Sequence, residues 1–121
     1  MKEDKKAQVL AGVSPLVTVI VATLNASKTL QSCIDSIVSQ TWPKKELIIC
    51  DGLSKDGTVE ILRRNDAVIS HWCSETDSGI YNAWNKGLRR AHGDWICFLG
   101  ADDYFWDSNV LERCMNASLA N

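Results

Sequence analysis

The stretch VTVIVATLNASKTLQSCIDSIVSQTWP, residues 17–43, contains the first complete unit of the predicted fold. It opens with a β-branched run, residues 17–23, which is typical of a buried strand. Apolar residues then recur at helical spacing over residues 30–38, and Asn25 or Ser27 is placed to cap that helix. A strand followed directly by an amphipathic helix predicts a parallel sheet with helical crossovers.

The same alternation continues to the end of the chain. Further strands are predicted at residues 46–50, 68–73 and 95–99, and helices at residues 58–64, about 79–92 and from about residue 108. The last strand is apolar throughout, which predicts that it is fully buried. The expected fold class is α/β, a Rossmann-like three-layer α/β/α arrangement around a mostly parallel sheet of about four strands.

Length and hydropathy predict one folded domain. A chain of 121 residues is long enough to bury a single core. Residues 1–14 are mostly charged and polar and are expected to be a flexible N-terminal extension, with the domain at residues 15–121. The longest apolar segment, residues 16–24, is too short to cross a bilayer. No transmembrane segment is therefore expected, and peripheral membrane association stays open.

Charge and cysteine usage exclude several classes of protein. The formal net charge is −2, with thirteen basic and fifteen acidic residues, so a broad basic face for nucleic acid is not expected. The five cysteines are widely spaced and show neither a CxxC motif nor zinc-ligand spacing. We therefore expect a reduced, cytoplasmic protein.

Polar side chains follow every predicted strand at its carboxyl end. They are Thr23 and Asn25, then Asp51, then Glu75 and Asp77, then Asp102 and Asp103. Ligands of open α/β sheets bind beyond these strand ends, so one site is expected there. Carboxylates that converge repel one another unless a cation lies among them, and Mg²⁺ or Mn²⁺ prefers such oxygen ligands together with phosphates. The pair Asp102 and Asp103 is the predicted metal site, and a polar turn or helix start is the alternative interpretation.

The loop DGLSKDGT, residues 51–58, differs from a calcium-binding EF-hand because Leu53 and Lys55 stand where oxygen ligands are needed. Asp56 and Thr58 are interpreted as structural residues that cap the next helix. Asp51 ends the preceding strand and is predicted to accept hydrogen bonds from the imide or ribose groups of a ligand.

Taken together, these stretches resemble the nucleotide-binding half of the family 2 glycosyltransferases, which have the GT-A fold. The segments that carry the resemblance are VTVIVATLNASKTLQSCIDSIVSQTWP, ELIICDGLSKDGT and ETDSGIYNAWNKGLRRAHGDWICFLGADD, in that order. The resemblance implies transfer of a sugar from a nucleotide-diphosphate sugar, first of all a UDP-sugar, to a hydroxyl of a glycan or lipid-linked acceptor. Cell-surface polysaccharide or glycan synthesis is the implied context.

The resemblance also implies roles for individual residues. The expected nucleotide-binding residues are Thr23, Asn25, Asp51, Asp77, Lys86 and Asp102, and the expected metal ligands are Asp102 and Asp103. Lys86 would reach phosphate, or else lie on a solvated helix face. Gly100 stands where many relatives have Asp or Asn, which leaves two carboxylates for the metal. Tyr81 and Trp84, three residues apart, are interpreted as facing the core rather than stacking on a sugar.

The catalytic residue stays unassigned. The resembled enzymes are mostly inverting and use an Asp or Glu well downstream as general base, whereas Asp107 and Glu112 are better explained as helix charges. We therefore expect a donor-binding half-domain whose base lies beyond Asn121. The alternative is a non-catalytic nucleotide-sugar-binding module completed by a partner chain. A Rossmann-type dinucleotide protein is disfavoured because residues 22–29 contain no glycine.

Overall fold

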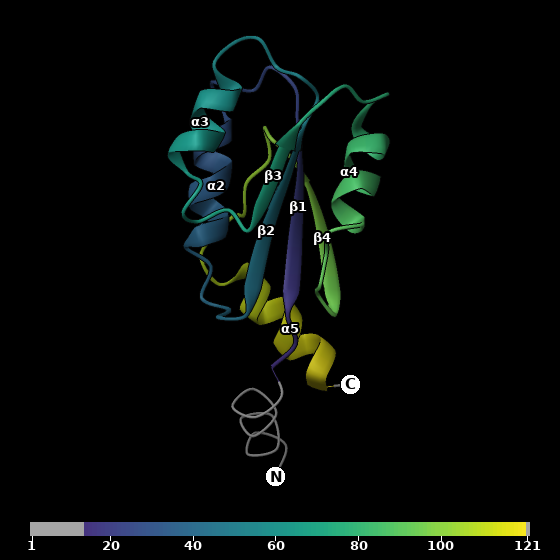
Figure 1. The fold of residues 1–121 in the computed structure, drawn as a ribbon. Helices are drawn as coiled ribbons and strands as arrows, with labels where there is room; N and C mark the ends of the chain where they lie inside the picture. Colours follow the sequence, from purple (N-terminus) through teal and green to yellow (C-terminus); the bar gives the residue numbers. More distant parts are fainter. Residues whose placement is uncertain (1–13, 121) are drawn as a thin grey trace.

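The structure is a computed structural model and describes residues 14–120. The predicted N-terminal extension, apart from Ser14, lies outside the described residues. Strands and helices alternate strictly (Figure 1): β1 (Val17–Thr23), α2 (Leu30–Val38), β2 (Lys45–Asp51), α3 (Thr58–Arg64), β3 (His71–Ser74), α4 (Ile80–Leu88), β4 (Trp95–Gly100) and α5 (Val110–Ala120). The expected order of elements is confirmed.

The four strands form one parallel sheet in the order β3-β2-β1-β4. From β1 the chain moves outward through β2 to β3 and then returns to the other side of β1 for β4. Helices α2 and α3 cover one face of the sheet and α4 covers the other (Figure 1). The predicted three-layer α/β/α fold is therefore confirmed.

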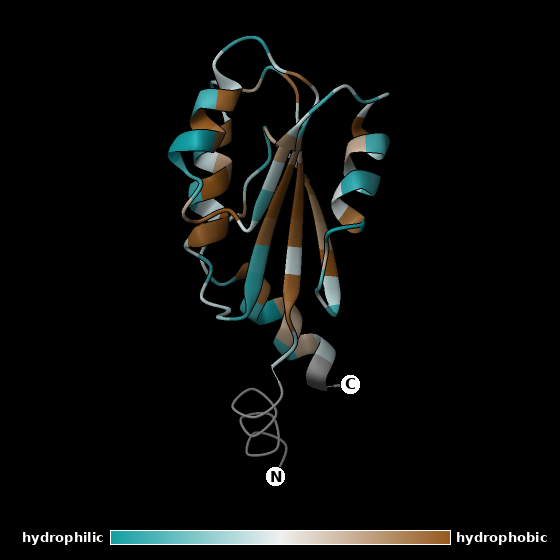
Figure 2. Cartoon of the chain, viewed as in Figure 1, coloured by the Kyte–Doolittle hydropathy of each residue, from teal (hydrophilic) through white to brown (hydrophobic). Residues whose placement is uncertain are grey.

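Alternation along the strands divides the core between the two faces of the sheet. Val19 and Val21 of β1 pack on the face covered by α2, α3 and α5, and Ile20 between them packs on the face covered by α4. This follows from the two-residue period of side chains in a strand. Hydrophobic colouring accordingly runs along β1 and β2, while α2 and α3 carry both hydrophobic and hydrophilic residues (Figure 2).

Two element boundaries differ by three or more residues from the sequence-based prediction. β3 begins at His71 rather than Val68, because the N–H groups of Val68 and Ile69 donate to the carbonyl oxygen of Asn65 in the turn after α3. α4 ends at Leu88 rather than near residue 92.

The prediction that the last strand is fully buried is wrong. In β4, Trp95 is 45% and Phe98 is 40% exposed. Within the described residues β4 pairs only with β1, so its outer edge and part of its side chains face solvent. Tyr81 is also not core-facing, since it is 76% exposed. Trp84 is half-buried and contacts Phe98 at a tilted angle, with ring centroids 5.1 Å apart.

The predicted caps of the first helix are also wrong. The N-cap of α2 is Thr29, and no side chain bonds there. Asn25 instead accepts a hydrogen bond at Oδ1 from the N–H of Lys55 at 2.8 Å, and the N–H of Ser27 donates to Asp56 Oδ2 at 3.1 Å. The β1–α2 loop is thus bound to the β2–α3 loop.

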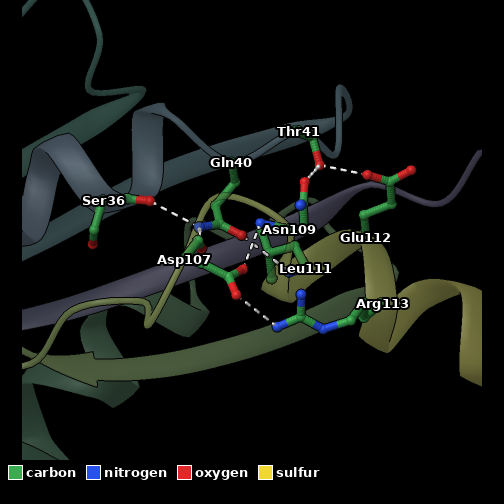
Figure 3. Close-up of polar contacts among 8 residues, drawn as sticks. All are labelled: Ser36, Gln40, Thr41, Asp107, Asn109, Leu111, Glu112 and Arg113. Atoms are coloured by element: carbon green, nitrogen blue, oxygen red, sulfur yellow. Dashed lines mark hydrogen bonds and ion pairs between the residues drawn. The ribbon is translucent and has the colours of Figure 1, made fainter.

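The segment between β4 and α5 is held by side chains at and just after the end of α2 (Figure 3). Gln40 is buried, and its Nε2 donates to the carbonyl oxygen of Asp107 at 2.6 Å. Gln40 Oε1 accepts from the N–H of Leu111 at 3.0 Å, which satisfies a donor in the first turn of α5. The last helix, expected from about residue 108, thus begins at Val110, and a side chain from outside the helix bonds its first turn.

Gly87 lets α4 approach the sheet closely, which gives a stability prediction. A Cβ at this position would lie 2.5 Å from Ile20 Cγ2, a methyl on a stiff β-branched side chain. We expect Gly87→Ala to lower the free energy of unfolding by about 1–2 kcal/mol despite the better helix propensity of Ala. Urea unfolding measures this difference.

Asn85→Ala is the matched control, because Asn85 is exposed on the same helix and should change the stability by less than about 0.5 kcal/mol. A Gly87→Ala chain as stable as the Asn85→Ala chain would contradict the close packing of α4.

Candidate functional site

The register of the sheet brings the polar strand ends together. Thr23 pairs with Asp51, and Asp51 pairs with Ser74. On the other side of β1, Ala22 pairs with Gly100, directly before the loop that carries Asp102. The expectation that the strand ends deliver their polar side chains to one edge is confirmed.

A pocket of about 450 Å³ lies at this edge, between the ends of β1 and β4. This is the point where the strand order reverses, the usual ligand position in open α/β sheets. Its lining residues are Ala22, Thr23, Leu24, Asn25, Ala26, Thr29, Asp77, Gly79, Ile80, Ala83, Gly100, Ala101 and Asp102. Four predicted residues therefore share the pocket: Thr23, Asn25, Asp77 and Asp102. Asp51, Lys86 and Asp103 do not line it.

Asp51 lies below the pocket, where its carboxylate is hydrogen-bonded to the ends of the neighbouring strands. Its side chain is 1% exposed and accepts four hydrogen bonds. Oδ1 accepts from the hydroxyls of Thr23 and Ser54, the latter at 2.5 Å. Oδ2 accepts from the Ser54 N–H at 2.8 Å and from the Ser74 hydroxyl at 2.7 Å. The carboxylate therefore links β1, β2, β3 and the loop after β2.

The charge state of Asp51 follows from these contacts. Burial alone raises the pKa of the carboxyl group, but the bonds from Ser54, Thr23 and Ser74 outweigh burial and hold the pKa below its usual value. Asp51 is therefore ionised at neutral pH. Its bonds are internal, so a ligand contact, as predicted from the sequence, requires one of these donors to move.

Asp77, in the loop between β3 and α4, forms one wall of the pocket. Its Oδ1 accepts from the N–H of Gly79 at 3.0 Å, and Gly79 has a φ of 130°, which favours glycine. The carboxylate also lies against Gly52, where an added Cβ would be 2.8 Å from Asp77 Oδ2. The position of Asp77 thus depends on a glycine from the neighbouring loop.

Lys86 of α4 binds the β3–α4 loop, which carries Asp77. Its Nζ donates to the carbonyl oxygen of Thr76 at 2.6 Å and lies 3.2 Å from Glu75 Oε1. In this position the ammonium group holds the segment that leads to Asp77. The predicted contact of Lys86 with a phosphate stays a prediction.

Asp102 and Asp103 lie over Gly100 at the end of β4. A Cβ on Gly100 would be 3.1 Å from Asp102 Oδ1 and 3.3 Å from Asp103 Oδ2, so both carboxylates reach the same small region. Asp103 Oδ2 accepts from the N–H of Gly100 at 3.0 Å and closes the turn. Asp102 is exposed and lines the pocket.

These two carboxylates fit a divalent cation that takes its remaining ligands from a phosphate or water. Within residues 14–120 no group of three or more His, Cys, Asp or Glu residues is arranged to hold a metal. Metal binding by Asp102 and Asp103 therefore stays a prediction that needs further oxygen ligands from outside this pair.

Comparisons with known proteins agree with this geometry. The family model for glycosyl transferase family 2 matches residues 18–121, and the chain belongs to this family. A PGL/p-HBAD biosynthesis glycosyltransferase of Mycobacterium tuberculosis is 38% identical over 105 residues, which cover 83% of this chain and 40% of the relative. The UDP-Glc:alpha-D-GlcNAc-diphosphoundecaprenol beta-1,3-glucosyltransferase WfgD of Escherichia coli is 36% identical, covering 88% of this chain and 42% of the relative.

Solved structures show the same fold. The mannosyltransferase PcManGT of Pyrobaculum calidifontis, in complex with GDP-Man and Mn²⁺, matches with a TM-score of 0.76 and 29% identity. The match covers 89% of this chain and 32% of that one. The expected GT-A fold is therefore confirmed. The chain spans about 40% of the length of the curated relatives it matches.

Within residues 14–120 no helix has the length and apolar character needed to cross a bilayer. The expected cytoplasmic location stays a prediction.

Sequence reasoning missed Ser54 and Gly52. Ser54 bonds Asp51 with both its N–H and its hydroxyl, and the Asp-x-x-Ser spacing of a side-chain-closed turn could have indicated this pair. No sequence signal would have shown that Gly52 lies against Asp77, because the contact joins two separate loops.

The hydrogen bonds of Asp51 predict a pH-dependent loss of stability on substitution. Asp51→Asn replaces an accepting oxygen with a donor and should lower the free energy of unfolding by about 2–4 kcal/mol at pH 7. The pKa in the folded chain lies below the unfolded value of about 3.9, so this contribution is present above that pH and is lost as pH falls through the folded pKa. Urea unfolding from pH 7 to pH 3 measures it.

Asp102→Asn is the control, since this rim carboxylate makes no hydrogen bond that Asn would break and should leave the stability within about 0.5 kcal/mol. A stability difference between the unchanged and Asp51→Asn chains that stays constant down to pH 3 would contradict the proposed role of the ionised carboxylate.

Proposed function

We propose that this chain binds the donor of a glycosyltransferase that transfers a sugar from a UDP-sugar to an acceptor hydroxyl in cell-surface polysaccharide or glycan synthesis. One observation carries the proposal: Asn25, Asp77 and Asp102 converge on a pocket at the strand-order reversal of a family 2 sheet. The named UDP-Glc and diphosphoundecaprenol substrates of the E. coli relative support the donor and a lipid-linked acceptor.

In this proposal different pocket residues bind different parts of the donor. Asn25 and Asp77 bind the nucleotide or sugar, while Thr23 and Asp51 hold the strand ends beneath it. Gly79 and Ile80, at the start of α4, also line the pocket, and a helix N-terminus favours an anionic group such as a diphosphate.

The carboxylates at the end of β4 would hold Mg²⁺ or Mn²⁺. Asp102 reaches into the pocket and is the direct ligand in this proposal, and Asp103 orients the turn or adds a second oxygen. When bound, the cation offsets the negative charge that develops on the departing nucleoside diphosphate. The Mn²⁺ in the P. calidifontis complex supports a divalent ion.

We propose that further polypeptide, in cis or from a partner chain, packs against the open edge of β4 and supplies the acceptor wall and the general base. The exposed Trp95 and Phe98 beside that edge support this. The alternative of a non-catalytic module is not favoured, because the named relatives are glycosyltransferases.

Metal-dependent binding of UDP tests the proposed function. Asp102→Asn removes the carboxylate that faces the pocket, so the affinity for UDP in the presence of Mn²⁺ should fall at least about tenfold, which is about 1.4 kcal/mol. Binding without metal should change little. Isothermal titration calorimetry measures both.

Glu60→Gln, an exposed substitution on α3 away from the pocket, serves as the control and should bind like the unchanged chain. The proposal is wrong if the unchanged chain binds no UDP, or if Asp102→Asn retains the full effect of Mn²⁺.

The contact between Gly52 and Asp77 gives a second binding prediction. The φ of Gly52 is outside the left-handed region, so Gly52→Ala is tolerated by the backbone, but its Cβ displaces the Asp77 carboxylate. We expect UDP-sugar affinity to fall about threefold to tenfold, or roughly 1 kcal/mol.

A double-mutant cycle separates this effect from general damage. In an Asp77→Ala background Gly52→Ala should have almost no further effect, because the displaced group is gone. Equal losses in both backgrounds would show that Gly52 acts by another route.

A further inference from the structure

Cys50 and Cys73 lie directly opposite each other on adjacent parallel strands. The register pairs Cys50 of β2 with Cys73 of β3, and both side chains pack on the face covered by α4. Neighbouring strands are about 4.8 Å apart, which is within the Cα separation of about 4.4–6.8 Å found in disulfides. All five cysteines, each of which lies within the described residues, are free thiols.

The two thiols differ in their environments. Cys50 is 2% exposed, and an added Cβ on Gly87 would lie 3.5 Å from its sulfur, so it is tightly enclosed by α4. Burial, and secondarily the Cys73 thiol beside it, raises the pKa of Cys50 to about 12. Cys73 is half-buried, near the open edge of β3. An oxidant therefore reaches Cys73 first, with Cys50 placed to react second.

The next pair in the register belongs to the candidate site. Asp51 follows Cys50, Ser74 follows Cys73, and the Ser74 hydroxyl donates to Asp51 Oδ2 at 2.7 Å. A disulfide between Cys50 and Cys73, one residue before Asp51 and Ser74, would change the separation of β2 and β3 where the Ser74–Asp51 hydrogen bond forms. The other cysteines lack such a position, since Cys97 pairs with Val19 in the sheet and Cys33 and Cys114 lie on helices.

We propose that Cys50 and Cys73 form a peroxide-sensitive dithiol that closes to a disulfide and weakens the nucleotide site above it. The Cys73 sulfur attacks one peroxide oxygen, the O–O bond breaks, and a sulfenic acid and one water form. The Cys50 sulfur then attacks the sulfenic sulfur, loses its proton and expels a second water. Two thiols and one hydrogen peroxide thus give one disulfide and two waters, and a thiol reductant reverses the change.

Peptide mapping of the folded 121-residue chain tests the cross-link. The five cysteines fall in five different tryptic peptides, so every pairing is distinguishable. After limited hydrogen peroxide treatment, alkylation of remaining thiols and digestion without reductant, we expect the Cys50 and Cys73 peptides joined, and released by dithiothreitol. This readout does not depend on the proposed function.

Three results would overturn the cross-link. They are recovery of both peptides alkylated, irreversible oxidation of Cys73 with Cys50 still alkylated, and preferential pairing of Cys97 with Cys114. The same treatment in urea is the control, because pairings there should no longer favour Cys50 and Cys73. Cys73→Ser should remove the cross-link while leaving the fold, judged by circular dichroism, unchanged.

The effect on the site rests on the proposed function and is measured separately. We expect peroxide to lower the affinity for UDP with Mn²⁺ at least about fivefold in the unchanged chain, to restore it on reduction, and to have no effect on Cys73→Ser. A cross-linked chain that binds UDP as tightly as the reduced chain would overturn the coupling, whereas absence of UDP binding in the reduced chain would overturn the proposed function.

Discussion

The buried carboxylate of Asp51 is the constraint on which the site edge of the structure depends. An ionised group that is 1% exposed is costly unless hydrogen bonds surround it, and four donors do so here. Because these donors come from Thr23, Ser54 and Ser74, the charge can be satisfied only when β1, β2 and β3 end in register. The same hydrogen bonds that offset the cost of burying the charge therefore also align the strand ends below the pocket.

The acidic residues of the strand ends divide into two kinds. Asp51 is enclosed and fully bonded, whereas Asp102 is exposed at the pocket and Asp103 bonds only the turn at Gly100. The negative charges of Asp102 and Asp103 also affect a buried thiol. Burial, and then the charges of Asp103 and Asp102, raise the pKa of Cys33 to about 12. An uncompensated negative field at a pocket is a condition that favours a cation.

The sequence predicted the elements of the fold well because periodicity and strand-ending polar residues are local signals. It failed where the outcome depends on a neighbour. An apolar run does not show that β4 has a partner on one side only, and helical spacing did not show that Tyr81 faces solvent. Nor could the orientation of Asp51 be predicted, since two of its partners, Thr23 and Ser74, come from other strands.

The two sides of the pocket differ in the hydrogen bonds that hold them. On the β1 side four backbone N–H groups join the segments after β1 and β2. Asn25 donates to the hydroxyl of Ser54, Ala26 to that of Thr58, Ser27 to the carboxylate of Asp56, and Lys55 donates back to Asn25 Oδ1. On the β4 side Asp102 is held only through its own turn. A ligand that meets a preorganised wall loses less entropy there, while the Asp102 side can adjust to a cation and its phosphate oxygens. This asymmetry is consistent with the proposed donor, whose nucleotide would meet the more extensively bonded side and whose diphosphate would meet the Asp102 side.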